Sequence, residues 1–330
     1  MIQSITLYHG YTEHFNIPVI QSKIDKLNHI IDTISHAIVN NNSSQPSLGM
    51  LSGSLEVVKA QQEIAKLEKE LADGKNTWDD FHILATERPV FNPPNPKTSY
   101  IDIPGGNGSL DMSESLTGYP VYENRTGSFR FRVMNDYYDQ RRTELYKKEW
   151  AKHYSEIMKY LHGQSMKAIL ADDPEWFYKG RFSVKEWKSG NTWSEISIDY
   201  NVDPYKWRAI SSTEDWLWDT FNFETGIITQ RTFDKITIDS PNSFKTFHFN
   251  SALFGDAPIS PKVIVSDESN NGVGITIEFY NSYLGINKTL IFKEGTTYAP
   301  DIVFYGQEDE YTMNIKGEGT ISFDFRIGRL

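Results

Sequence analysis

Two heptad seams in the first seventy residues constrain the fold more than any other feature of the chain. Apolar residues recur at alternating steps of four and three over 20–38 and again over 57–71, as on one helix face. Pro18 precedes the first seam, Gly74 follows the second as a predicted C-cap, and the polar stretch 40–53 separates them. This pattern predicts an antiparallel helical hairpin. Its candidate partner-docking residues are Ile24, Leu27, Ile31, Ile34, Ile64, Leu67 and Leu71.

The seams leave two interpretations of this hairpin open. The remaining positions of both helices are polar and charged, which is typical of a solvated face. The hairpin is therefore either a coiled-coil decoration of the surface or a docking arm for a partner helix or protein.

From residue 77 onward the pattern changes to that of β-strands. Apolar and polar residues alternate over 129–133 and 196–202, with one long helix predicted between them over 138–161. Further strands are predicted over 244–249, 274–280, 289–292 and 320–327. We therefore expect a mainly β chain with helices, of the α+β class, that ends in a β-sandwich.

The alternation over 320–327 is regular enough to assign its faces. Odd-numbered residues are apolar and are expected to point inward, whereas Ser322, Asp324 and Arg326 are expected to point outward.

Composition excludes several classes of protein. The formal net charge is -11, which is opposite to the basic face that general nucleic-acid binding requires. The chain has no cysteine, so it has no disulfide and no thiolate metal site. Neither a signal peptide nor an apolar run of membrane-spanning length is present in the sequence. We expect a protein made in a cytosol, without a membrane partner.

The glycine-rich stretch 104–108 raises the question of a phosphate loop. It lacks the Lys-Ser/Thr pair of a P-loop and the glycine spacing of a dinucleotide site, so we predict a tight turn. Carboxylate clusters at 79–80, 172–173 and 308–310 have the composition of turns and solvated loops. We expect no catalytic residue, no cofactor and no metal.

Aromatic residues make up 14% of the chain, and most are expected in β-sheet cores. A sugar-stacking platform near Trp216 and Trp218 is the alternative, and it would make the chain a carbohydrate-binding module. A glycan hydrolase is a third hypothesis, which requires two facing carboxylates.

A series of short motifs runs in order from 77 to 206. The first are Ile103-Pro104-Gly105, Gly108-Ser109-Leu110-Asp111, Ser113-Glu114, Gly118 and Tyr122-Glu123-Asn124-Arg125. After a long helix come His162-Gly163, a short strand, an Asp-Asp-Pro turn, Gly180-Arg181 and Asp203-Pro204-Tyr205. This order resembles that of the belt domain of siphophage distal tail proteins. The stretch 218–224 resembles the start of the family's galectin-like C-terminal sandwich.

The resemblance implies a structural protein of the phage tail tip, or baseplate, that takes part in host attachment. It implies a homo-hexameric ring between the tail tube protein and the tail-tip hub, with DNA only passing through its lumen. Receptor-binding or tape-measure proteins are further candidate partners. The implied location is the virion, after assembly in the host cytoplasm. The candidate ring-contact and turn residues are Pro104, Gly105, Gly106, Gly108, Asp111, Arg125, Gly180 and Arg181.

The resemblance also gives a domain organisation. Residues 1–17 and 75–206 are expected to form the belt domain, and 207–330 the galectin-like sandwich. The hairpin, 18–74, is an insertion for which the family provides no role.

Overall fold

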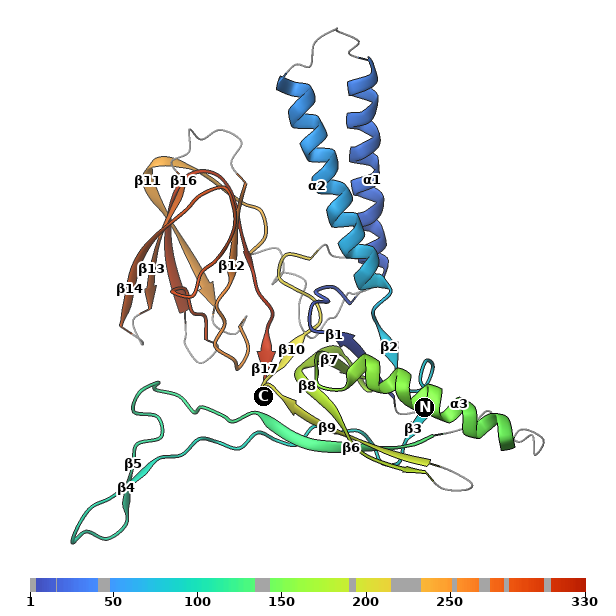
Figure 1. Cartoon of the computed structure of the whole chain (residues 1–330). Helices are drawn as coiled ribbons and strands as arrows, with labels where there is room; N and C mark the ends of the chain where they lie inside the picture. Colours follow the sequence, from blue (N-terminus) through green and yellow to red (C-terminus); the bar gives the residue numbers. More distant parts are fainter. Residues whose placement is uncertain are drawn as a thin grey trace.

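The computed structural model describes residues 4–15, 17–40, 48–133, 143–189, 194–214, 233–250, 254–266, 274–281, 285–305 and 310–330. The described residues are mainly β with three helices, which confirms the expected α+β class. A helical hairpin stands beside two sheets, one built mostly from the N-terminal part of the chain and one from the C-terminal part (Figure 1). No helix in the described part of the chain is long and apolar enough to cross a membrane.

The N-terminal sheet has nine antiparallel strands. They are β1 Ile5–His9, β2 Lys75–Asn76, β3 Ile83–Ala85, β6 Arg125–Val133, β7 Gln164–Leu170, β8 Asp173–Ser189, β9 Ser194–Val202, β10 Lys206–Arg208 and β17 Gly328–Arg329. Seven lie in the order β2-β1-β7-β8-β9-β6-β3, while β10 pairs with β8 and β17. The predicted alternation of β6 and β9 is present, since their apolar residues are buried on one face.

One face of this sheet is covered by the helix α3, Thr143–Leu161. Ile157 and Leu161 of α3 are fully buried and pack in the same core as Met166 and Ala168 of β7. The described helix covers 143–161 of the predicted 138–161, and the first five predicted residues lie outside the described part of the chain. Its last turn thus fixes the helix on the sheet.

The helical hairpin consists of α1, Ile17–Asn40, and α2, Leu48–Leu71. It is inserted between β1 and β2, which pair with each other through Thr6↔Asn76 and Leu7↔Lys75. Because the insertion leaves and returns at neighbouring antiparallel strands, the hairpin can project without interrupting the sheet (Figure 1).

The prediction of a polar break over 40–53 was wrong at its C-terminal end, since α2 begins at Leu48 and includes Gly53. The predicted C-cap at Gly74 was also wrong, because α2 ends at Leu71 and Gly74 comes three residues later, after a turn and without a positive φ. A side chain at Gly74 would collide with the ring of Tyr8, which explains the glycine by packing.

The C-terminal sheet has six strands. They are β11 Ile236–Asn250, β12 Lys262–Ser266, β13 Ile275–Asn281, β14 Ile286–Phe292, β15 Gly295–Tyr298 and β16 Glu310–Asp324. The first half of β16 pairs with β13 and its second half with β12, while β11 follows it along both halves. The sheet therefore curls over one core.

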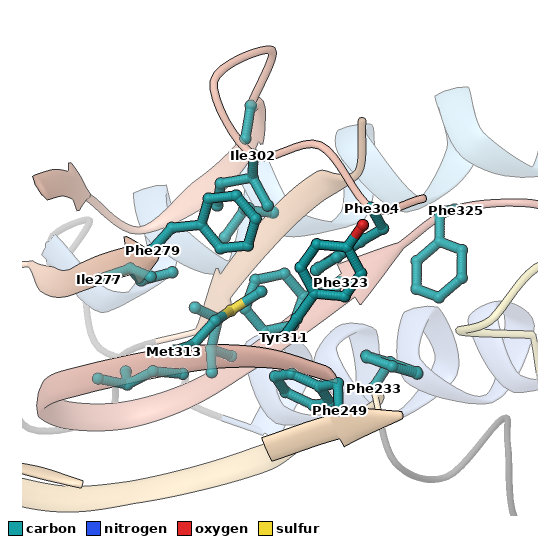
Figure 2. Packing of buried hydrophobic residues seen from close by; sticks show 14 of the residues in the cluster. Phe233, Phe249, Ile277, Phe279, Ile302, Phe304, Tyr311, Met313, Phe323 and Phe325 are labelled. Atoms are coloured by element: carbon teal, nitrogen blue, oxygen red, sulfur yellow. The ribbon is translucent and has the colours of Figure 1, made fainter. Parts of the chain in front are cut away.

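Two glycines lie where β16 passes from one half to the other. Gly317 and Gly319 have φ values of 146° and 130°, a region that is essentially restricted to glycine. Odd-numbered residues of β16 point inward on both sides of this bend. The two glycines are also odd-numbered, so they belong to the inward-facing series. The core contains Phe279, Phe304, Tyr311 and Phe323, all fully buried (Figure 2).

Ser322 has the parity of the outward-pointing residues of β16, as expected, yet it is only 7% exposed. Its hydroxyl donates to Asp234 Oδ1 at 2.9 Å and accepts from the Lys235 amide at 2.8 Å, so the loop before β11 covers it. Its hydrogen bonds offset the burial of the hydroxyl.

Both β10 and β17, which flank the C-terminal sheet in the sequence, belong to the N-terminal sheet. The proposed boundary between 206 and 207 falls inside β10, and β17 at the chain end pairs with β10 through Trp207↔Gly328. The sugar platform predicted at Trp216 and Trp218, the stretch 218–224, and Glu308–Asp309 all lie outside the described residues.

Candidate functional site

A two-stranded arm extends away from the N-terminal sheet (Figure 1). It is formed by β4, Tyr100–Asp102, and β5, Ser109–Asp111, which make a sheet of their own. Ile101 and Leu110 are directly paired across the arm. Both are at least half exposed, as are Tyr100 and Ile103. An isolated hairpin with exposed apolar side chains is marginally stable and is typical of a contact surface.

The tip of the arm holds the predicted turn residues Pro104, Gly105, Gly106 and Gly108. Gly105 and Gly108 have φ values of 78° and 81°. Apart from its sequence neighbours, a Cβ at either position would have no atom of the described residues within 4 Å. The left-handed conformation, and not a close contact within the described chain, therefore explains these glycines.

The next predicted residue, Asp111, organises the base of β5. Its Oδ1 accepts the Ser113 hydroxyl at 2.5 Å and the Ser113 amide at 2.9 Å. These hydrogen bonds lower the pKa of Asp111. Asp111 thus shapes the turn that follows the arm, in keeping with an Asx motif.

Arg125, Gly180 and Arg181 lie together on the sheet, away from the arm tip. Arg125 and Gly180 both pair with Val202 of β9, from opposite sides. Arg125 is buried, and its guanidinium donates to Pro204 O at 2.7 Å and to Asn92 O at 3.1 Å. It ties the start of β6 to the end of β9.

The close approach of β9 leaves no room for a side chain at position 180. An added Cβ would collide with the backbone of Asn201 and Val202 on β9. Arg181 is exposed and donates to Gly163 O at 2.8 Å, so it closes the turn between α3 and β7. All three residues therefore have roles within this chain.

The seam residues of the helical hairpin face each other. Ile24 and Leu67 are buried together with Ile20 near the root, and Leu27, Ile64 and Leu71 pack against them. Ile31 and Ile34, nearer the tip, remain half-buried. Ile30 lies outside the seam and is 47% exposed. The apolar surface is therefore less well covered toward the tip than at the root.

A buried carboxylate fixes the root of this hairpin. Asp73, just after α2, accepts the His9 amide at 2.6 Å, the Tyr11 hydroxyl at 2.8 Å and the Thr12 hydroxyl at 2.6 Å. Burial raises the pKa of Asp73, but hydrogen bonds from Thr12, His9 and Tyr11 outweigh burial and hold that pKa below its ordinary value.

The segment after β1 also contacts the C-terminal part of the chain. Glu13 lies 3.0 Å from Lys66 Nζ of α2 and 3.7 Å from Lys262 Nζ of β12. His14 Nδ1 lies 2.8 Å from Glu214 Oε1, which also lies 3.2 Å from Arg326 Nη2. We call the segment 11–14 the junction segment, because its residues contact the hairpin and both sheets.

Sequence reasoning missed the junction segment. Its partners lie 53 positions away at Lys66, 200 at Glu214 and 313 at Arg326. No spacing pattern connects residues so far apart. The one available signal was the density of polar residues in a segment that joins a strand to a helix.

Comparison with solved structures finds chains of similar fold, and one of them is described here. No protein-family model and no curated protein matches the chain. The Dit protein (gp 19.1) of SPP1, described as a paradigm of the hub adsorption apparatus of phages that infect Gram-positive bacteria, aligns with 76% of this chain and 96% of its own. The identity is 12% and the TM-score 0.48. A likeness at this level assigns neither a family nor a partner.

Proposed function

We propose that this chain is a structural component of a bacteriophage tail tip. In this proposal six copies form a ring that joins the tail tube to the tail-tip hub and gives a platform for receptor-binding proteins. The ordered motifs of 77–206 support it, since they resemble those of distal tail proteins. In this proposal the belt domain is 1–17 with 75–206, the inserted hairpin is 18–74 and the galectin-like sandwich is 207–330, with β10 at the boundary between the first and the last.

The observation that carries the proposal is the exposed apolar surface of the β4–β5 arm. Ile101 and Leu110 are neighbours on this arm and find no core in their own chain. Burial of apolar surface stabilises by about 25 cal/mol per Å², so contact with a neighbouring copy would favour assembly. An arm of one copy on a different surface of the next is a heterologous contact, which forms a ring when it closes.

The first test is the mass of the purified chain in solution, followed by negative-stain images. Six chains give 6 × 38.0 = 228 kDa, and the expected image is a ring with a central hole. A 38.0 kDa species at every protein concentration would contradict a self-assembling ring.

A double variant of the arm tests whether the arm forms the contact between neighbouring copies. Ile101→Glu with Leu110→Glu places two like charges on the arm and is expected to abolish the ring without changing the unfolding temperature. The matched control is Ile291→Glu on β14, where the side chain is 65% exposed. A ring that survives the double change, or is lost equally in the control, would contradict the arm as the contact.

A further inference from the structure

An open cavity of about 570 Å³ lies at the junction of the N-terminal sheet, the hairpin root and the C-terminal sheet. The junction segment 11–14 forms one wall, Lys167 and Lys179 come from β7 and β8, and Tyr298 comes from β15. Its size is that of a site for a small organic molecule, since such sites measure about 300–1,000 Å³.

Three lysines that line this cavity are without a carboxylate partner. Among the described residues, no Asp or Glu oxygen lies within 4 Å of the ammonium groups of Lys23, Lys167 or Lys179. Lys167 is 7% exposed and donates to Thr12 O. A buried ammonium that no carboxylate compensates is costly.

The carboxylates of the cavity are already engaged. Glu13 lies between Lys66 and Lys262, and Glu214 lies between His14 and Arg326.

The other two carboxylates have neutral donors. Asp324 Oδ1 accepts the Thr213 hydroxyl at 3.0 Å and the hydroxyl of Ser211. Asp203 accepts a hydrogen bond from the Trp207 side chain and also feels the charge of Lys179. None of the four carboxylates contacts the ammonium of Lys167.

Positive charges therefore crowd one another here. Burial, followed by the charges of Arg326 and Lys179, lowers the pKa of Lys167 to about 8. Glu13 and Glu70 act in the opposite direction but do not compensate. In a chain with a net charge of -11, an excess of cations around one cavity is unusual. An anion bound between these cations would relieve their repulsion.

We propose that this cavity binds the phosphate group of a phosphorylated sugar or polyol, with Lys23, Lys167 and Lys179 as its cationic ligands. Lysine binds phosphate as a point charge and requires no planar geometry. Space beyond one phosphate group remains in the cavity, and Trp207 and Tyr298 lie in its wall. Aromatic rings offer the apolar faces on which a sugar or polyol packs. The proposal does not depend on ring formation.

Calorimetric titration of the full chain tests it, with inorganic phosphate, glucose 1-phosphate and glucose as three probes at constant ionic strength and pH 7. We expect one site per chain, with glucose 1-phosphate at least fivefold tighter than inorganic phosphate, and glucose alone not binding. The variants Lys179→Gln and Lys23→Gln are each expected to weaken glucose 1-phosphate at least fivefold. Lys185→Gln is the matched control, because Lys185 lies on the same strand but pairs with Asp199 at 3.4 Å.

The outcomes separate the parts of the proposal. Equal affinity for both phosphates would overturn the sugar or polyol component and leave a bare phosphate site. No saturable binding to either phosphate would overturn the site itself, as would equal weakening in Lys185→Gln. Unfolding curves of each variant show whether the fold is intact, which keeps a loss of binding interpretable.

Discussion

The Nδ1 atom of His9 lies 2.5 Å from Oδ1 of Asp73, at the point where the helical hairpin joins the sheet. The other ring nitrogen of His9 lies 3.1 Å from the Tyr160 carbonyl oxygen. Both ring nitrogens therefore lie within hydrogen-bond distance of an oxygen atom. The hairpin root is thus held by polar contacts that converge on a buried carboxylate.

Asp73→Asn is expected to destabilise the protein by about 2–4 kcal/mol, because it removes a charged acceptor from several buried donors. Chemical denaturation measures this loss. Asp25→Asn, on the exposed side of α1, is the control and is expected to change stability by less than about 0.5 kcal/mol. Equal stability of Asp73→Asn and the unaltered chain would contradict the role of this carboxylate.

The same residue predicts a dependence on acid. The pKa of Asp73 is lower in the folded chain than in the unfolded chain, so its contribution is complete above the unfolded value. That contribution is lost as the pH falls from the unfolded pKa through the folded pKa, because over this range the unfolded chain binds a proton at Asp73 that the folded chain excludes. Between pH 6 and pH 3 the unaltered chain is expected to lose more stability than Asp73→Asn. Parallel curves would contradict this.

Lys167→Met is expected to stabilise the chain at pH 7 and to weaken phosphate binding. Because the folded pKa of Lys167 is about 8, folding at pH 7 buries a proton-bearing group at a cost. The unfolded lysine binds its proton more tightly, so this cost disappears as the pH rises from 8 toward the unfolded value.

The gain at pH 7 is expected to be about 1–2 kcal/mol, and it should shrink by pH 10. The charged groups that act on Lys167 are Arg326, Lys179, Glu13 and Glu70. Measuring the pH dependence of stability for Lys179→Gln as well separates the contribution of Lys179. A destabilising Lys167→Met with unchanged phosphate binding would indicate a purely structural lysine.

Gly180→Ala is expected to destabilise by about 2–3 kcal/mol, since its methyl group meets the β9 backbone. Gly163→Ala provides the comparison, because Gly163 has a φ of 71° and open space around its Cβ position. It should cost only about 1 kcal/mol for the left-handed conformation. Thermal unfolding measures both, and the reverse order would contradict the packing explanation of Gly180.

A shortened hairpin tests docking. Joining Leu27 to Gln61 through a short glycine-rich loop removes Ile31 and Ile34 and retains the root core of Ile20 and Leu67. The isolated chain should keep its sheets and its assembly state, whereas binding to a tail-tip partner should be lost. Virions that assemble and infect normally with this variant would identify the hairpin as decoration.

Much of the fold could be predicted from periodicity. Steps of four and three identify α1 and α2, and alternation identifies β6, β9 and β16, because each pattern reports one buried face. The start of α2 could not be predicted in this way. Gly49 and Gly53 suggest a break, but both lie within α2 as it runs back along α1, so tertiary packing overrides local propensity.

The cavity and the junction segment were beyond sequence reasoning for a different reason. Glu13, Glu214 and Lys262 meet only because two sheets and a hairpin are placed around one short segment. Side chains brought together by three-dimensional placement alone leave no periodic signal. Gly105 and Gly108 have left-handed φ values, and such a turn requirement is local, so a glycine-rich stretch can express it in the sequence.

Because the helical hairpin is long, a small rotation at its root produces a large displacement at its tip. Each helix has 24 residues, so the hairpin is a lever of about 36 Å, and a tilt of about 5° at Asp73 displaces its tip by about 3 Å. Glu13 joins this lever to β12 through Lys66 and Lys262. A tilt of the hairpin at its root therefore changes the spacing between Lys66 of α2, Glu13 and Lys262 of β12.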